Sequence, residues 1–421
     1  MATLLAPAQC TGQLPSEFVD GLRYVARQPI LDLRGRLHGY ELLFRNDPDL
    51  AFCGDGDLAT RTMLDNSVIF GLEKLSGGVT AFVNCTLESL TEDLVNVLPP
   101  SMTVLEILET IDPTPALIKA CRRLKAAGFR VALDDFIWKP GIEPLVELAD
   151  YIKVDFILTG AKERKKLLQQ LSGYAVALVA EKVETQDEYK QACAEGFTLI
   201  QGFYFCRPVL LKNRNLPANR LSHIEILRLL HDESIDLRKL TRLVKRDASL
   251  TYRLLRLINS PLCAVRQEVC SVQSALIAVG EDVFRRIATL AITSELNADR
   301  SEELLRMAFV RGRFCELAAG LRGLNSTEQY LLGLLSLLPA MLRLPMEELA
   351  SSLPLREEIR LALMNMALPE GILLAWLVNH EHGDWATCDA IAHANDLDQK
   401  KLQRFYGEAV VWAESALNFA N

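Results

Sequence analysis

Short apolar runs rich in β-branched residues alternate with longer helical patterns from Tyr24 to about Phe205. This alternation is typical of strands joined by crossover helices in a parallel sheet. One helical stretch, PTPALIKACRRLKAAGF (113–129), has proline near its start and glycine near its end, which are common helix boundary signals. The runs expected to form strands are YVARQPILDL, VTAFVN, MTVLEI, FRVALDDF, DYIKVDF, AVALVAEKV and FTLIQGF.

The pattern changes in the second half of the chain. From about Leu216 onward, strand-like runs disappear and apolar residues recur three and four positions apart, as in Leu254, Leu255 and Ile258. This spacing predicts an all-helical domain, and the polar, proline-bearing stretch 215–221 is the expected linker. The predicted division is an N-terminal extension (1–20), an α/β domain (21–212) and an all-α domain (213–421).

Length and charge agree with two globular domains. A chain of 421 residues is too long for one ordinary hydrophobic core. Its 54 acidic residues exceed its 46 basic ones, and the formal charge of −8 gives no general attraction to polyanions. Nucleic acid is therefore not an expected partner, because the basic stretches 162–166 and 237–247 are more simply explained as solvated helix faces.

The spacing of the cysteines and the sequence of the N-terminus indicate the cellular compartment in which the protein is expected. The ten cysteines include no Cys-x-x-Cys pair, so neither a zinc ribbon nor a redox motif is present, and most are expected to be small buried hydrophobes. The first residues lack the charged start and sustained apolar stretch of a secretory signal, and no apolar segment reaches membrane-spanning length. We therefore expect a cytoplasmic protein without a membrane partner.

Polar residues stand at or near the ends of the predicted strands. In a closed barrel of parallel strands these ends open on one face, where ligand chemistry is assembled. Carboxylate and amide oxygens are ligands for hard divalent cations, and two such ions can activate water and stabilise the leaving oxygen of a phosphodiester. The residues brought together in a TIM-like barrel would be Asn84, Glu106, Asp134, Asp135, Lys153, Glu181 and Gln201.

Seven segments of the first half occur in the order of a known family. They are RQPILDLRGRLHGYELLFR, FVNCT, LEILE, LDDF, IKVD, AEKVET and QGFYFCRP. This series, over about residues 21–210, resembles the signatures of EAL domains, the cyclic di-GMP phosphodiesterases and their degenerate relatives. The resemblance implies a barrel that binds cyclic di-GMP, with Mg²⁺ or Mn²⁺ as cofactor and Ca²⁺ as an inhibitor of an active enzyme.

The resemblance also implies a role for individual residues. The first metal would be held by Glu41, Asn84, Glu106 and Asp134, and a second metal by Asp135. Lys153 would hold the attacking water, and Glu181 would act as general base or as a second-metal partner. Glu109 would anchor the loop after DDF. Gln28 and Arg45 would contact the guanine and phosphate of the dinucleotide, and Gln201 would complete the rim.

Three positions depart from the family pattern. Leu42 replaces the alanine of the EAL triplet, and Arg27 replaces a tyrosine. The glycine-containing loop of active enzymes becomes IWKPGIEP (137–144), in which two prolines and two bulky apolar residues prevent the same backbone conformations. We therefore expect binding of metal and nucleotide with slow or absent hydrolysis to linear pGpG. The alternative is that Asp134 and Asp135 only cap helices or pair with Lys153.

The helical half resembles the HDOD domain, an output or scaffolding module related to HD phosphohydrolases. The resemblance rests on the stretches 240–262 and 269–291. Ser336 and Leu337 stand where HD enzymes carry their metal-binding His and Asp, so a conventional metal phosphohydrolase is excluded. The histidines elsewhere receive no role: His231–Asp232 is expected at a helix end, and His380, His382 and Asp384 are expected in a surface loop.

Two classes of function stay open. In the first, the chain is a cyclic di-GMP phosphodiesterase regulated by its helical half. In the second, it is a non-catalytic signalling adaptor whose helical half binds an unidentified protein partner. The retained ligand set favours the first class and the altered loop favours the second. The oligomeric state, including a homodimer, is left open.

Overall fold

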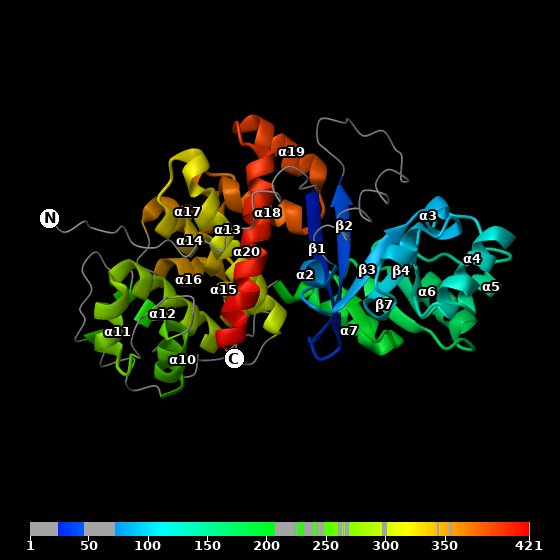
Figure 1. Cartoon of the computed structure of the whole chain (residues 1–421), viewed down its shortest axis with the longest axis horizontal. Helices are drawn as coiled ribbons and strands as arrows, with labels where there is room; N and C mark the ends of the chain where they lie inside the picture. Colours follow the sequence, from blue (N-terminus) through cyan, green and yellow to red (C-terminus); the bar gives the residue numbers. More distant parts are fainter. Residues whose placement is uncertain are drawn as a thin grey trace.

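The computed structural model describes two parts of the chain, a barrel and a helical domain (Figure 1). The described residues are 24–45, 72–206, 248–259, 269–296, 301–342, 345–352 and 356–420, together with scattered positions between 223 and 265. The predicted linker 215–221, the boundary at 212/213 and His231–Asp232 lie outside them.

Eight strands close into a barrel in chain order. This architecture confirms the predicted TIM-like barrel. The strands are β1 (Tyr24–Asp32), β2 (Leu37–Arg45), β3 (Thr80–Cys85), β4 (Thr103–Ile107), β5 (Arg130–Leu133), β6 (Tyr151–Asp155), β7 (Ala177–Glu181) and β8 (Leu199–Gln201).

The first strand corrects the expectation of seven parallel strands. β1 is antiparallel to both of its neighbours, β2 and β8, and β2 is a separate strand that the periodicity did not distinguish. A tight turn joins β1 to β2: the carboxylate of Asp32 accepts hydrogen bonds from the backbone N–H groups of Arg34 and Arg36, and Gly35 has φ of 76°. Such a short connection can only join antiparallel strands.

Helices cover the outside of the barrel. Local signals place their ends: in α4, Thr114 caps the first turn with Pro115 at its start, and α7 ends where Gly196 adopts the left-handed conformation at φ of 93°. The α-helices of this part are α2 (Leu72–Ser76), α3 (Leu87–Thr91), α4 (Pro115–Ala126), α5 (Glu143–Val146), α6 (Ala161–Leu171) and α7 (Gln186–Glu195). Short 3-10 turns lie at Leu94–Val97, Pro100–Met102 and Tyr204–Cys206.

The basic run 162–166 lies in α6, as expected. Four of its five residues are exposed, but Arg164 is buried. Its guanidinium lies 3.9 Å from the centre of the Phe156 ring and pairs with Glu195 on α7 at 2.8 Å. This run therefore forms a solvated face together with one structural ion pair.

The described residues of the second part form helices joined by short connections, which confirms the all-α prediction. Its α-helices are α10 (Ala248–Ile258), α11 (Val272–Val279), α12 (Glu281–Leu296), α13 (Glu302–Ala318), α14 (Ser326–Leu335), α15 (Leu338–Leu342), α16 (Met346–Ser352), α17 (Glu357–Met364), α18 (Ile372–Glu381), α19 (Trp385–Ala394) and α20 (Gln399–Ala420). Short 3-10 turns follow α13 at Ala319–Arg322 and precede α18 at Pro369–Gly371.

Helix α13 is the centre of the helical core. It packs against α14 and α20, and most of its residues are buried. The approach to α14 is so close that a Cβ atom added at Gly333 would lie 2.2 Å from the Arg311 carbonyl oxygen. Glycine is therefore needed at position 333 for these two helices to pack.

The barrel and the helical domain meet along the β1–β2 hairpin. Helix α18 contacts β1, and α18 and α20 lie beside β1 in Figure 1. The hydroxyl of Ser301 donates to the Gly35 carbonyl at 2.7 Å, and Arg27 pairs with Glu414 of α20 at 3.2 Å. The ring centres of Phe203 and His382 are 3.9 Å apart. This contact uses both charged and aromatic residues.

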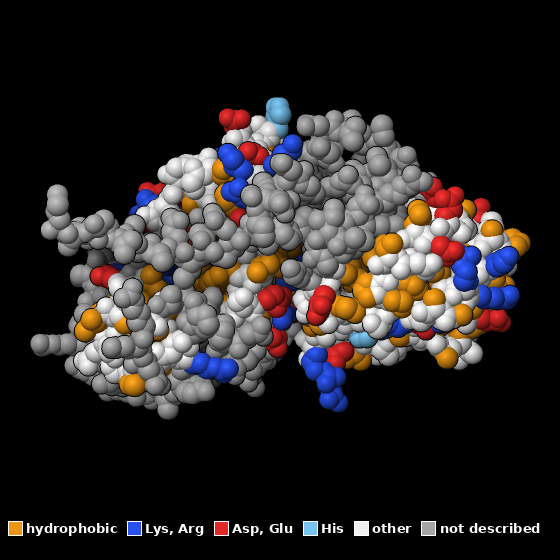
Figure 2. Space-filling model, in the orientation of Figure 1, with side chains coloured by type: hydrophobic (Ala, Val, Ile, Leu, Met, Phe, Trp, Pro, Cys, Tyr) orange, Lys and Arg blue, Asp and Glu red, His pale blue; other side chains and the backbone are white. Residues whose placement is uncertain are grey.

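Charged side chains of both signs occur on the described surface. On the face shown in Figure 2, basic and acidic side chains lie close to one another over described parts of both domains.

Within the described residues, no single helix has the length and apolar character needed to span a bilayer. The bent pair formed by Glu357–Met364 and Pro369–Glu381 meets these two criteria only when its helices are taken together.

Candidate functional site

The period of two along each strand separates an apolar layer of the barrel interior from a polar one. The apolar layer contains Ile30, Phe82, Val104, Ala132, Tyr151, Val179 and Leu199. Two positions nearer the mouth, the same faces carry Gln28, Asn84, Glu106, Asp134, Lys153, Glu181 and Gln201. Since side chains alternate across a strand, each polar residue follows an inward apolar one, in reverse order on the antiparallel β1.

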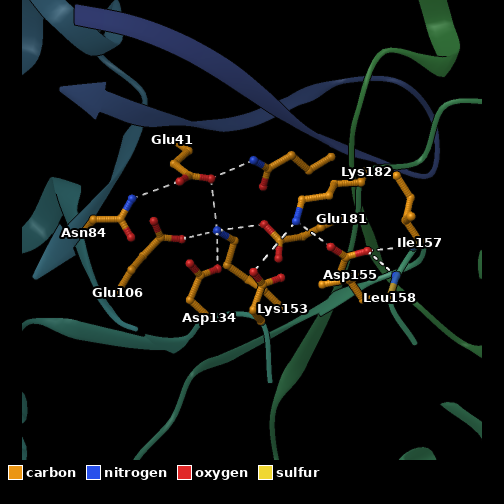
Figure 3. Close-up of polar contacts among 12 residues, drawn as sticks. Glu41, Asn84, Glu106, Asp134, Lys153, Asp155, Ile157, Leu158, Glu181 and Lys182 are labelled. Carbon is orange, nitrogen blue, oxygen red and sulfur yellow. Dashed lines mark hydrogen bonds and ion pairs between the residues drawn. The ribbon is translucent and has the colours of Figure 1, made fainter. Parts of the chain in front are cut away.

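Lys153 lies at the centre of the polar layer (Figure 3). Its ammonium nitrogen, which is fully buried, lies within ion-pair distance of four carboxylates. The distances from Nζ are 3.0 Å to Glu41 Oε2, 2.7 Å to Glu106 Oε1, 2.8 Å to Asp134 Oδ1 and 2.9 Å to Glu181 Oε1. We call these five residues the inner cluster.

Amide side chains border the inner cluster. Asn84 Nδ2 donates to Glu41 Oε1 at 3.0 Å, and Gln201 Nε2 donates to Glu41 Oε2 at 2.7 Å. The same Gln201 nitrogen lies 2.8 Å from Gln28 Oε1. Glu41 is therefore held by residues from β3, β6 and β8, although the sequence separates them widely.

Burial and crowding of charge set the protonation of the inner cluster. Burial raises the pKa of Glu106 well above its ordinary value, and the charges of Glu41 and Asp134 act in the same direction. Burial also raises the pKa of Glu181 to about 8 against the effect of Lys153. Burial opposes ionisation of Glu41, but Lys153 and the amide donors outweigh it and lower its pKa. One ammonium thus does not stabilise four ionised carboxylates.

A second lysine lies beside the inner cluster. The ammonium of Lys182 pairs with Asp155 Oδ2 and lies 3.7 Å from Asp135 Oδ2. Asp155 Oδ1 accepts the backbone N–H groups of Ile157 and Leu158 at 2.6 and 2.8 Å. We call Lys182, Asp135 and Asp155 the outer cluster, and the pair of Lys182 with Asp155 is drawn in Figure 3.

The donor set fits a hard divalent cation. Asn84 Oδ1, Glu106 Oε2 and Gln201 Oε1 are buried without a hydrogen-bond partner, and carboxylate and amide oxygens are the ligands that Mg²⁺ and Mn²⁺ prefer. Within the described parts of the chain, no group of three or more His, Cys, Asp or Glu side chains already has the arrangement of a metal site. The carboxylates are arranged around the Lys153 ammonium instead.

The altered loop after Asp135 packs on the barrel. The Phe136 N–H donates to the Lys153 carbonyl at 2.9 Å, which holds the loop to β6. The Trp138 ring lies 6.2 Å from the rings of Phe136 and Tyr174 and joins the hydrophobic cluster outside the strands. Ile137 is 62% exposed. The indole thus packs in the outer layer of the barrel.

Two further residues were predicted to belong to the site, Glu109 and Arg45. The backbone carbonyl of Glu109 accepts a hydrogen bond from Lys139 Nζ at 2.9 Å, so the chain at Glu109 does contact the altered loop. Arg45 ends β2, but its side chain is outside the described atoms.

Sequence reasoning missed Lys182, Asp155 and the use of Arg27. Lys182 and Asp155 both lie in segments that resemble the family, one residue after Glu181 and two after Lys153. Their position next to inward-facing residues was the available signal. Arg27 is buried at the contact between the domains, 4.5 Å from the centre of the Tyr40 ring. The departure at this position therefore serves the contact with the helical domain.

In the helical domain, Ser336 and Leu337 are structural residues. Ser336 Oγ donates to the Gly333 carbonyl at 2.7 Å and lies 3.2 Å from Arg311 Nη1, while Leu337 is buried in the core. Arg311 in turn pairs with Glu381 at 2.7 Å. An arginine–glutamate pair thus lies next to the position of the missing HD ligands.

The expectation that His380 lies in a surface loop was wrong. His380 is fully buried near the end of α18, where its Nε2 lies 3.0 Å from Gln403 Oε1. Burial lowers the pKa of His380 to about 3. The helix continues because LLAWLV supplies apolar residues to the core just before His380. Asp384 caps the first turn of α19 by accepting the Thr387 N–H.

Comparison with known proteins identifies both domains. The chain matches the EAL domain over residues 80–208 and the HDOD domain over residues 216–352. It is 33% identical over 406 residues to the uncharacterized protein YuxH of Bacillus subtilis, covering 94% of this chain and 99% of that protein. It is 32% identical over 401 residues to the cyclic di-GMP phosphodiesterase CdgJ of Vibrio cholerae, covering 93% and 92%.

A solved structure resembles part of this chain. The complex of Klebsiella pneumoniae BlrP1 with calcium and cyclic di-GMP has a TM-score of 0.37 at 25% identity, covering 44% of this chain and 55% of that chain. The matches to CdgJ and YuxH, in contrast, extend through both domains. This chain therefore belongs to the family of proteins in which an EAL domain is followed by an HDOD domain, a family related to cyclic di-GMP phosphodiesterases.

Proposed function

We propose that this protein is a cyclic di-GMP signalling protein whose barrel binds a divalent metal and cyclic di-GMP. Hydrolysis to linear pGpG is slow or absent, and the HDOD domain transmits the bound state to a protein partner. The name of the relative CdgJ, a cyclic di-GMP phosphodiesterase, supports the choice of nucleotide.

The convergence of the inner cluster carries this proposal. Glu41, Glu106, Asp134 and Glu181 come from four strands or their ends and meet within 3.0 Å of one nitrogen. Burying so many carboxylates is costly unless a cation compensates them. A barrel used only as a scaffold has no need of this arrangement.

Metal binding would use the oxygens of Glu41, Asn84, Glu106 and Asp134. When bound, Mg²⁺ or Mn²⁺ would supply charge stabilisation for a phosphodiester and a more acidic water. Lys153 would hold a water or phosphoryl oxygen, and Glu181 would accept or hold a proton. Gln28 and Gln201, which share a hydrogen bond at 2.8 Å, would form the rim that contacts the nucleotide.

The test separates binding from turnover. Calorimetric titration of the full chain with Mn²⁺ and then cyclic di-GMP is expected to show saturable binding, and the variant Glu41→Ala is expected to lose it. Chromatography of an Mg²⁺ incubation would detect linear pGpG. Heat signals that are equal for the wild type and Glu41→Ala would refute the proposed site. Rapid formation of pGpG would refute the proposed slow turnover.

A non-catalytic adaptor is the second candidate, and the altered loop favours it. Pro144 stands in the first turn of the short helix α5, and Phe136 and Trp138 hold the segment against the barrel. In that case the barrel does not turn over nucleotide and the HDOD half binds its partner without it. A cellular effect that persists in the Glu41→Ala variant would support the adaptor.

A further inference from the structure

The mouth of the barrel contains two lysine-centred clusters side by side. Two pairs of adjacent residues join them, because Asp134 and Glu181 contact Lys153 while the next residues, Asp135 and Lys182, belong to the outer cluster. Figure 3 shows both ammonium groups among the carboxylates at this end of the barrel. Each cluster thus has one ammonium group, with four carboxylates in the inner cluster and two in the outer cluster.

The backbone directs Lys182 into this position. Lys182 has φ of 55° and Asp135 has φ of 39°, in the left-handed region that residues with side chains rarely adopt. Both residues directly follow an inward-facing carboxylate at the end of a strand. The left-handed backbone interrupts the regular alternation of the strand at these two positions, where the Lys182 ammonium lies 3.7 Å from Asp135 Oδ2. Strain of this kind is typical of functional positions.

The Lys182 ammonium contacts one carboxylate oxygen of Asp135 and one of Asp155. Its ammonium pairs with Asp155, which is almost fully buried, and with Asp135, which is about one-third exposed at its side chain. Asp135 Oδ1 is buried without a hydrogen-bond partner, so Asp135 directs one oxygen to Lys182 and leaves the other unsatisfied. Asp135 is also the residue that the family resemblance makes the ligand of a second metal.

We propose that Lys182 takes the place of a second divalent cation, so that the barrel binds one metal ion, in the inner cluster. This inference rests on the proposed function and extends it. The ammonium neutralises Asp135 from within the chain, and its charge repels a metal ion at the same oxygens. A site with one divalent ion lacks the second that would stabilise the opposite side of a phosphodiester displacement. Lys182 thereby sets the metal stoichiometry and limits hydrolysis.

Mn²⁺ binding to the full chain provides the test, with free Mn²⁺ measured by electron paramagnetic resonance. The test variants are Lys182→Gln, which keeps the length of the side chain, and Lys182→Gly, which also removes the left-handed strain. Lys182→Arg keeps the positive charge. Lys190→Gln is the matched control, because Lys190 is an exposed lysine on the neighbouring helix α7 that pairs with Asp187 at 3.2 Å.

Lys182→Gln and Lys182→Gly are each expected to bind one more Mn²⁺ than the wild type. The additional ion should bind at the outer cluster at least about tenfold more tightly than Mn²⁺ binds there in the wild type. Lys182→Arg and Lys190→Gln should match the wild type. An equal number of ions with equal affinity in the wild type and both neutral variants would overturn the inference, as would two ions in the wild type. Thermal melting of each variant checks that the fold is retained.

The same Mn²⁺ measurements distinguish the proposed metal binding by the inner cluster from the proposed role of Lys182. If the wild type binds no Mn²⁺ but Lys182→Gln binds one, the role of Lys182 stands and the proposed metal binding by the inner cluster fails. If the wild type binds one ion that Glu41→Ala loses, and Lys182→Gln gains none, the proposed function stands and the role of Lys182 fails.

Discussion

The phenol of Tyr40 donates a 2.7 Å hydrogen bond to Glu303 Oε2, across 263 residues of sequence and from the barrel to helix α13. Tyr40 directly precedes Glu41 on β2. Because neighbouring side chains of a strand point to opposite faces, Tyr40 contacts the helical domain while Glu41 faces the inner cluster. Glu303 also pairs with Arg306 at 2.7 Å. The helical domain thus contacts the strand that presents Glu41.

Removing this hydroxyl should weaken the contact between the domains. Tyr40→Phe is expected to lower stability by about 1.5–3 kcal/mol, because a buried hydrogen bond to a charged acceptor is lost. Urea unfolding of the full chain measures the effect. Tyr189→Phe is the control, since its hydroxyl bonds the Leu33 carbonyl at an exposed site and should contribute less. Equal losses in both variants would contradict a special role for Tyr40.

Loss of the central ammonium should expose the excess of negative charge in the inner cluster. Lys153→Met is expected to destabilise the protein by about 3–5 kcal/mol, because buried carboxylates lose their cation. Millimolar Mn²⁺ should restore part of the loss if the same oxygens bind metal. Thermal melting with and without Mn²⁺ provides the measurement. A variant as stable as the wild type without metal would show that Lys153 does not compensate these charges.

Metal affinity should depend on pH. Burial raises the pKa of Glu181 to about 8, so this carboxyl group is largely protonated at pH 6, and burial also raises the pKa of Glu106 well above its ordinary value. Glu106, a proposed ligand, must be ionised to bind a divalent ion, and an ionised Glu181 beside it adds attraction, so affinity should rise as the pH increases from about 6 to 8. Mn²⁺ titrations across this range test the sign. Affinity that is constant or falls with pH would argue against metal binding in this cluster.

His380 should make the helical domain sensitive to acid. Its pKa is lowered to about 3 by burial in the folded protein, whereas an exposed histidine has a pKa of about 6.5. The unfolded state therefore binds the extra proton, and this contribution to stability is complete above pH 6.5 and is lost progressively as the pH falls toward 3. The maximum slope is about 1.4 kcal/mol per pH unit.

The variant His380→Gln lacks this titration. Its stability should fall less steeply than that of the wild type between pH 6.5 and 4.5, as measured by urea unfolding at several pH values. Other groups contribute equally to both proteins, so the difference in slope reports His380. Parallel curves would show that His380 does not titrate differently on folding.

The local pattern of the chain predicted much of the barrel and its site. Alternation of apolar strands with helices indicated the fold, and polar residues at or near the ends of the predicted strands indicated four of the five residues of the inner cluster, whereas Glu41 came from the family resemblance. The hairpin was less readable, because β1 and β2 form one continuous run around the short turn at Gly35. Periodicity reports which residues are buried, but it does not report strand direction.

The sequence by itself determined the order of the two domains, the strand ends that carry Asn84, Glu106 and Asp134, and the absence of the HD ligands at Ser336 and Leu337. Only the tertiary structure decided that Lys182 lies between Asp135 and Asp155, that His380 is buried, and that Tyr40 meets Glu303. The physical reason is the sequence separation of the residues that interact. Strand and helix patterns depend on neighbours a few residues apart, whereas a charge or hydrogen bond depends on which distant segments the closed fold brings within about 3–4 Å.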